Sequence, residues 1–186
     1  MFVLLGTGGA LAAAQATPVR LEGQALAVMP LERRSSYSSH DWMRSAFAEA
    51  LTARLTGTPG MRVLDFGAGA DALRGTLEAA PERPTLAEIQ GAARAVGADL
   101  VVWGGVDKQA SEVSIQLTVT RVSDGRALGT LRTAGEYDAP WRPLSEAVRG
   151  VLKVLERSPG SSQDARIGTP AARDRYALTL FGRGLN

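Results

Sequence analysis

An alternating stretch near the middle of the chain constrains the fold more than any other feature. From residue 113 to residue 120, apolar side chains alternate with polar ones, which is the pattern of a half-buried strand. The apolar set is Val113, Ile115, Leu117 and Val119. Because these four fall on one face, we expect them to be buried together. Because Val122 breaks the alternation, we also expect a β-bulge or a local twist near Arg121.

Two further strands flank this stretch. Before it, residues 100–103 form a short apolar run that is typical of a strand covered on both faces, followed by a polar break over 107–111. After it, Asp124-Gly125 is the dipeptide of a tight hairpin turn, from which the chain returns over 126–133. The region therefore predicts three consecutive antiparallel strands.

The first half of the chain alternates between short strands and helices. Apolar runs at 24–29 and 61–66 predict strands. Residues 31–41, after the first of these strands, predict a polar loop. A helix follows this loop, because apolar residues recur every four positions. They are Met43, Phe47, Leu51 and Leu55. Residues 67–84 are rich in Gly and Ala and predict a loop with a short helix near 71–79.

Two more helices complete the pattern. Thr85 and Glu88 make a capping box that predicts a helix ending at Gly97, and an apolar stripe over 144–155 predicts the last helix. The predicted order is β-α-β-α-β-β-β-α. We therefore expect an α/β (α+β) fold: one mixed sheet of about five strands, helices packed on the sheet, and an antiparallel meander as its last three strands.

Composition excludes several classes of site. The chain has no Cys, which excludes disulfides, thiolate metal sites and lipid attachment through an N-terminal Cys, and a single His, which cannot form a multi-His metal site. The net charge of +2 does not suggest nucleic-acid binding. We expect no metal, no cofactor and no nucleic-acid partner.

Both ends of the chain differ from its middle. Residues 1–16 are apolar and end in Ala14-Gln15-Ala16, which predicts a secretory signal peptide truncated at its start; a buried N-terminal helix is the alternative. Residues 157–171 have the Ser, Gly and Pro content of a linker, and 172–186 predict a C-terminal helix. The domain itself is expected over 20–156.

The order of these motifs resembles the TolB amino-terminal-domain-like family, which includes envelope proteins related to CsgG, FlgO and LpoB. Three parts carry the resemblance over about residues 22–156: an apolar strand ending in Pro, a Gly-Ala-Asp before apolar residues and Gly, and a closing Asp-Gly turn. They are Val28-Met29-Pro30, Gly97-Ala98-Asp99 to Gly104, and Ser123-Asp124-Gly125. The resemblance implies a fold and an envelope location. Tetratricopeptide repeats often follow this domain, and 172–186 resembles the lead-in helix of such an array.

The strongest rival interpretation rests on residues 63–70, VLDFGAGA. This run resembles the first motif of S-adenosylmethionine-dependent methyltransferases, in which a strand leads into a Gly-rich loop that approaches the cofactor. Ala70 replaces the usual third Gly. Asp99 follows Asp65 by only 34 positions, too few for the βα units that such enzymes need. A strand end with small residues is favoured.

The polar loop supplies the candidate binding residues. Arg33 and Arg34 with Tyr37 combine cations and an aromatic ring, the residue types favoured at interfaces, and His40 lies beside them. A solvated loop is the simpler interpretation. The sequence therefore predicts a non-enzymatic, exported protein-interaction domain of the cell envelope, periplasmic in bacteria. Its protein partner would dock through a sheet edge or the 31–41 loop, and a homo-oligomer formed through a sheet edge is a further expectation. The alternative is a reduced methyltransferase-like protein.

Overall fold

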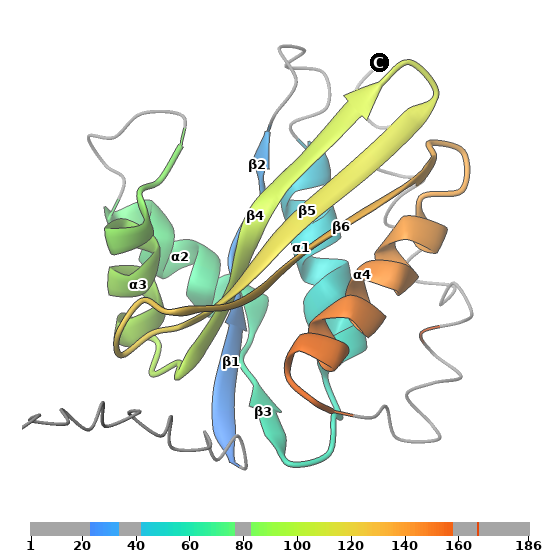
Figure 1. Cartoon of the computed structure of the whole chain (residues 1–186). Coiled ribbons are helices and arrows are strands. Elements are labelled where there is room, and N and C mark those ends of the chain that lie inside the picture. The colour runs from blue at the N-terminus through green and yellow to red at the C-terminus, as the bar shows by residue number, and fades with distance from the viewer. Residues whose placement is uncertain (1–22, 34–41, 77–82, 158–166, 168–186) are drawn as a thin grey trace, which may run out of the picture.

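The computed structural model describes residues 23–33, 42–76, 83–157 and 167 of the chain (Figure 1). They form one mixed sheet in the order β3-β1-β4-β5-β6, with a short sixth strand, β2, also paired to β4. Helices cover both faces of the sheet. The predicted fold class, with one mixed sheet and helices packed on it, is confirmed.

The parallel part of the sheet is short and buried. Strand β1 (Gln24–Val28) pairs with β3 (Met61–Val63) on one side and with β4 (Leu100–Gln109) on the other, parallel in both cases. Its residues Ala25 to Val28 are at most 3% exposed. Asp99 helps to fix this end, because its carboxylate accepts the backbone N–H of Ala25 at 2.8 Å.

The antiparallel meander follows the prediction closely. Strands β4, β5 (Glu112–Arg121) and β6 (Ala127–Glu136) pair in sequence order, and the four alternating apolar side chains of β5 are completely buried. The expected irregularity is present as a register shift between Val119 and Thr120. Strand β4 runs on to Gln109, however, through the residues expected to form a polar break, because Asp107 to Gln109 pair with Ser114 to Glu112 of β5.

The helices separate into two pairs that cover opposite faces. Helices α1 (Trp42–Leu55) and α4 (Trp141–Val154) pack on the face that carries Ile115, and α2 (Phe66–Thr76) and α3 (Leu86–Ala95) pack on the other (Figure 1). Helix α3 begins at the predicted capping box, in which the Thr85 backbone N–H donates to the Glu88 carboxylate at 2.6 Å.

Two local predictions in the first half of the chain were wrong. Strand β3 ends at Val63, and helix α2 begins at Phe66, inside the stretch expected to be strand and loop. The Asp65 carboxylate accepts the backbone N–H of Ala68 and so caps this early helix start. The predicted polar loop also holds β2 (Glu32–Arg33), which pairs parallel to β4.

The described core includes one residue from beyond 157. Ile167 is completely buried with the α1–α4 cluster, and its carbonyl accepts hydrogen bonds from Arg54 Nη1 at 3.1 Å and from the Ser145 hydroxyl. Arg54 also donates to the Ser145 hydroxyl at 2.9 Å. The predicted signal peptide, most of the linker and the predicted C-terminal helix lie outside the described residues.

Candidate functional site

Strand β6 forms one end of the sheet and pairs only with β5 among the described elements. The backbone N–H of Tyr137, just after β6, donates to the Ser111 carbonyl at 2.7 Å. In an antiparallel pair, hydrogen-bonded positions recur every second residue, so Leu131, Thr133 and Gly135 also turn their backbone groups toward β5. The residues between them turn their N–H and C=O groups to the open side.

Helix α4 packs against one face of β6. A Cβ atom added to Gly129 would lie 2.8 Å from Val154 Cγ2, and one added to Gly135 would lie 2.9 Å from Pro143 Cδ. These two glycines therefore permit a close approach of helix and strand. The Thr133 hydroxyl adds a polar contact between the same elements, because it donates to the Pro143 carbonyl at 2.9 Å.

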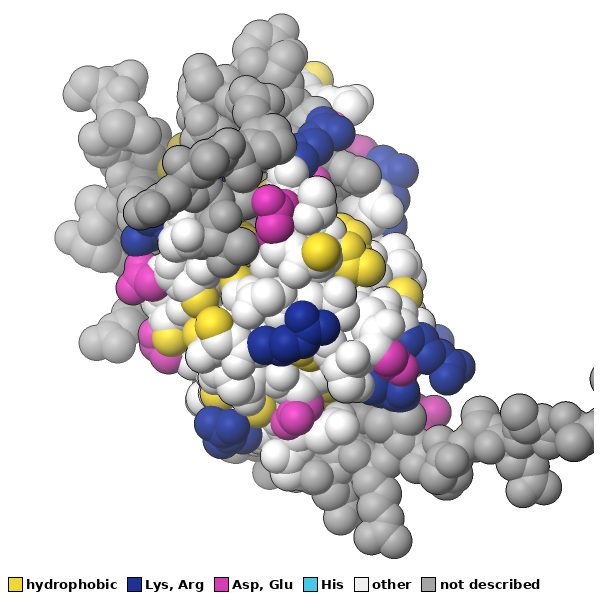
Figure 2. Space-filling view, turned by 90° about the vertical axis from the view of Figure 1, so that its left-hand side faces the viewer, with side chains coloured by type: hydrophobic (Ala, Val, Ile, Leu, Met, Phe, Trp, Pro, Cys, Tyr) yellow, Lys and Arg dark blue, Asp and Glu magenta, His cyan; other side chains and the backbone are white. Residues whose placement is uncertain are grey.

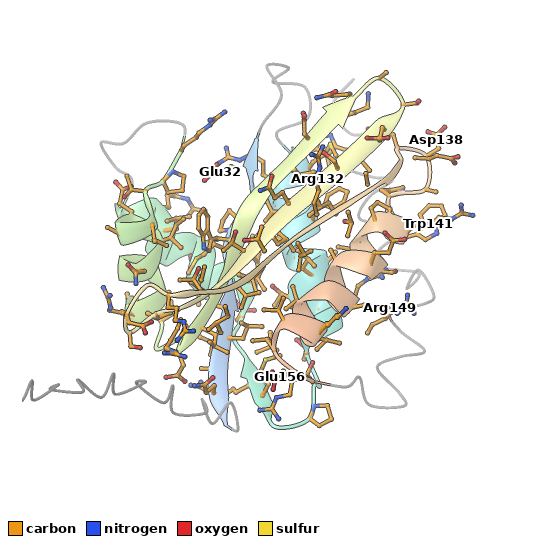
Figure 3. The ribbon with its side chains drawn as sticks, in the orientation of Figure 1. Glu32, Arg132, Asp138, Trp141, Arg149 and Glu156 are labelled. Atoms are coloured by element: carbon orange, nitrogen blue, oxygen red, sulfur yellow. The ribbon has the colours of Figure 1, made fainter. Side chains whose placement is uncertain are left out.

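The residues with outward backbone groups also have exposed side chains. They are Thr130, Arg132, Ala134 and Glu136. Their side chains lie on the face away from α4, and in Figure 3 Arg132 lies on the far side of the strand from Trp141 and Arg149 of α4. The Thr130 hydroxyl is 3.2 Å from that of Thr118 on β5. We call these four residues the β6 edge.

The end of β6 is tied to the tip of the neighbouring hairpin. The Lys108 ammonium lies 4.5 Å from the ring centre of Tyr137, which is a cation–π contact. Burial raises the pKa of Tyr137 above its ordinary value of 10.0, and the charge of Asp138 raises it further. The Tyr137 hydroxyl is therefore neutral at physiological pH, and the ring acts as a packing surface at this end of the edge.

Exposed charges on another side of the molecule do not gather into a patch. Figure 2 shows the side of α2 and α3, where Lys and Arg side chains are scattered singly among Asp, Glu and uncharged atoms. Across 23–33, 42–76, 83–157 and 167, no group of three or more acidic or histidine side chains could hold a metal ion. No helix within these ranges is long and apolar enough to cross a membrane.

The loop residues predicted as a binding site are only partly described. Arg33 lies in β2, paired in register with Val106 of β4. Arg34, Tyr37 and His40 lie outside the described residues, so the structure does not test whether the four come together. The sequence pattern predicted a sheet edge without saying which one. No local signal marks β6 as an edge, since it contains no Pro or Lys, the residues that often protect edge strands.

The VLDFGAGA run has a structural role in this fold. Its glycines lie within helix α2 rather than in an open loop, and the first turn of α2 is capped by Asp65. A Cβ atom at Gly69 would lie 3.6 Å from the Val28 carbonyl oxygen and 3.7 Å from Met29 Sδ. These are ordinary van der Waals distances, so the buried position of Gly69 against the end of β1 accommodates a small residue, and no cofactor is needed to explain one.

Known proteins resemble this chain at the level of the fold. No family model matches the sequence, and no curated protein matches it. Among solved structures, LpoB of Escherichia coli is 15% identical, with a TM-score of 0.49 over 72% of this chain and 80% of that one. The LpoB C-terminal domain of Salmonella enterica is 18% identical, with a TM-score of 0.46 over 62% and 84%.

TolB of Acinetobacter baumannii is 10% identical, with a TM-score of 0.47 over 72% of this chain and 28% of that one. These structural neighbours are LpoB and TolB proteins. At such identities the likeness concerns the fold, and the function proposed below depends on this chain's own residues.

Proposed function

We propose that this chain is a non-enzymatic protein-interaction and scaffolding domain of an exported cell-envelope complex, and that it acts by adding a partner strand to the β6 edge. The β6 edge is the observation that carries the proposal. Its four residues present backbone donors and acceptors along residues 129–136 of β6, over which the pairing with β5 has no register shift. A strand that pairs there gains main-chain hydrogen bonds, and the exposed side chains supply selectivity.

The envelope location rests on the sequence. The Ala14-Gln15-Ala16 pattern and the resemblance to the TolB amino-terminal-domain-like family both favour export. Expressed with its native upstream region in a Gram-negative host, the mature protein should begin at or near Thr17. N-terminal sequencing that finds residues 1–16 retained would remove the periplasmic assignment.

The edge can be blocked without changing the side-chain surface greatly. Ala134→Pro removes one outward N–H, and proline is tolerated on an edge strand where the N–H faces solvent. Ala134→Val is the matched control, because it adds bulk at the same position and keeps the N–H. We expect both variants to give the far-ultraviolet circular dichroism spectrum of the wild type.

Affinity capture from envelope extract with the three proteins then tests the proposal. Proteins retained by the wild type and by Ala134→Val should be reduced about tenfold or more with Ala134→Pro, since one edge hydrogen bond is lost and the Pro ring meets the incoming strand. Equal capture by all three would overturn docking at β6. The 31–41 loop, with Arg33, Arg34, Tyr37 and His40, would then be the surface to substitute.

The methyltransferase alternative has a direct test. Isothermal titration of the whole chain with S-adenosylmethionine should give no binding heat, because the glycines of the VLDFGAGA run lie within helix α2 rather than in an open loop, and Gly69 is buried against the end of β1. Saturable binding with a dissociation constant in the low micromolar range (about −8 kcal/mol) would make the alternative the better interpretation.

A further inference from the structure

We infer that the strand which occupies the β6 edge is β6 of a second copy of this chain, paired antiparallel about a two-fold axis at Ala134. The inference rests on the proposed function, because it names the partner at the same edge. The paired sheets would form one continuous sheet through two β6 strands. The backbone pattern and the charges of β6 favour this arrangement over the other antiparallel registers.

The backbone pattern restricts how two copies of β6 can pair. Only residues with outward N–H and C=O groups can exchange hydrogen bonds with an incoming strand, so a β6-edge residue must face another β6-edge residue. In a symmetric antiparallel pair, the register is described by the residue that faces Arg132. It can face Thr130, Arg132, Ala134 or Glu136 of the second copy.

The charges of β6 distinguish these registers. When Arg132 faces Arg132 of the second copy, like charges lie directly opposite each other, which is destabilising. When Arg132 faces Thr130 or Ala134, it has no opposite charge in register. Facing Arg132 against Glu136 creates two opposite-charge pairs, related by the two-fold axis, with Ala134 facing Ala134 between them. Each such cross-strand pair is stabilising.

The same features favour a second copy over a different protein. Within the strand, β6 carries one positive and one negative side chain, Arg132 and Glu136, on one face and four residues apart. Such a strand is complementary to itself in the antiparallel direction, since each charge meets its opposite. The small Ala134 side chain stands at the axis, where two identical side chains must meet. A partner with a different sequence would not require this symmetry.

Charge exchange tests the register on the full chain. Sedimentation velocity over a range of protein concentrations should show a reversible dimer of the wild type. Arg132→Glu and Glu136→Arg each place two like-charge pairs across the axis, so each should weaken dimerisation about tenfold or more. The double variant Arg132→Glu/Glu136→Arg restores opposite charges and should restore the dimer.

Cross-linking tests the position of the axis. The natural chain has no Cys, so a single introduced thiol can pair only with its copy. Ala134→Cys would place two thiols directly opposite each other, with Cα atoms about 5.5 Å apart, within the range of a disulfide. Thr130→Cys is the control, because the two copies of residue 130 would lie roughly 27 Å apart along the strands. After mild oxidation, Ala134→Cys should run as a dimer without reductant and Thr130→Cys as a monomer.

The outcomes separate this inference from the proposed function. Suppose that the wild-type chain is monomeric at every concentration, and that Ala134→Pro still reduces the capture of another protein. That result overturns the inference and supports the proposed function. A dimer that the single charge variants leave intact, or that cross-links through Thr130→Cys as readily as through Ala134→Cys, also overturns the inference. Restoration by the double variant together with selective cross-linking supports it.

Discussion

The two ends of the sheet present very different edges. At one end, β3 has only three residues, Met61–Val63. The side chain of Arg157 lies against Gly60, the residue before β3: a Cβ atom added to Gly60 would lie 2.9 Å from Arg157 Nη1. At the other end, β6 has ten residues and a row of backbone groups that pairs with no strand of the described residues. Natural proteins protect sheet edges by making them short or by covering them. The protected edge is β3, and the edge left open is β6.

The two edges also differ in how the chain supports them. Strand β3 is held through parallel pairing with β1, which is a buried strand. Strand β6 is held by β5 and by close packing of α4 through Gly129 and Gly135. An edge that is long, and that is held in place by a helix behind it, is suited to receive another strand, because the strand is already ordered and pairing then costs little conformational entropy.

The largest effect is expected from breaking the strand pair that carries β6. Gly104 in β4 has φ of 151°, and a Cβ atom there would collide with the backbone carbonyl oxygen of Gln116 in β5. Backbone cannot move aside as a flexible side chain can. Gly104→Ala should therefore lower the free energy of unfolding by about 3 kcal/mol, measured by urea denaturation.

The control for this substitution is Gly91→Ala in helix α3. A Cβ atom at Gly91 meets no atom within 4 Å, and Ala is the better helix former. This variant should be as stable as the wild type or about 0.5–1 kcal/mol more stable. Equal stability of Gly104→Ala and Gly91→Ala would show that β4 and β5 are not packed as described.

The second prediction concerns the layer behind β6. Ile167 is completely buried between α1 and α4, so Ile167→Ala should cost about 2–3 kcal/mol by leaving a cavity, and Ile167→Val about 1 kcal/mol. Thermal and urea unfolding give both values. Because α4 packs against β6, the packing lost with the Ile167 side chain should destabilise the β6 end of the sheet more than the β3 end.

Truncation provides an independent check on the same layer. Deleting 157–186 removes Ile167 with the rest of the predicted linker and C-terminal helix. The 20–156 domain should remain folded, with a loss of about 1–3 kcal/mol. Complete unfolding of the truncated chain would show that the predicted domain boundary is misplaced.

Hydrophobic periodicity predicted the elements that bury a continuous apolar face. The alternation from Val113 to Val119 located β5, and the capping box at Thr85 located the start of α3. These features succeed because each depends on residues close in the chain. The continuation of β4 to Gln109 was missed, since its polar residues pair as a strand beyond the buried core, where apolar periodicity gives no signal.

The edge residues could not be predicted for a related reason. Whether a strand lies at an edge depends on which strands pair, and the crossover that places β1 between β3 and β4 is set by contacts distant in the chain. The start of α2 was missed because Gly67 and Gly69 resemble a loop in sequence. In the fold, Gly69 is buried against the end of β1. Small residues alone do not distinguish a loop from a tightly packed helix.

The third prediction measures the open edge directly. In amide hydrogen exchange at low protein concentration, Thr130, Arg132 and Ala134 should exchange on the order of a hundredfold faster than Leu131 and Thr133, because only the latter N–H groups face β5. Global stability does not enter this comparison. At high concentration the fast set should become protected if two copies pair. Uniform protection along β6 at every concentration would contradict an open edge in the single chain.

The smallest effect is expected at the turn that begins β6. The Asp124 carboxylate accepts the backbone N–H of Arg126 at 3.1 Å and the Arg121 guanidinium at 3.0 Å. The hydrogen bond from the Arg126 backbone holds the pKa of Asp124 below its ordinary value of 3.8; burial opposes this shift, and the positive charge of Arg121 reinforces it. The ionised carboxylate is therefore the form that the folded turn prefers.

Because the folded-state pKa lies below the unfolded one, the Asp124 contribution is fully present above the unfolded pKa of 3.8 and is lost as the pH falls through the folded pKa. Asp124→Asn removes the charge and keeps a turn dipeptide, since Asn-Gly adopts the same turns as Asp-Gly. The variant should melt slightly below the wild type at neutral pH, and the two melting temperatures should converge as the pH falls through the folded-state pKa of Asp124. A difference that persists unchanged in acid would show that the side-chain amide, not the lost charge, disturbs the turn leading into β6.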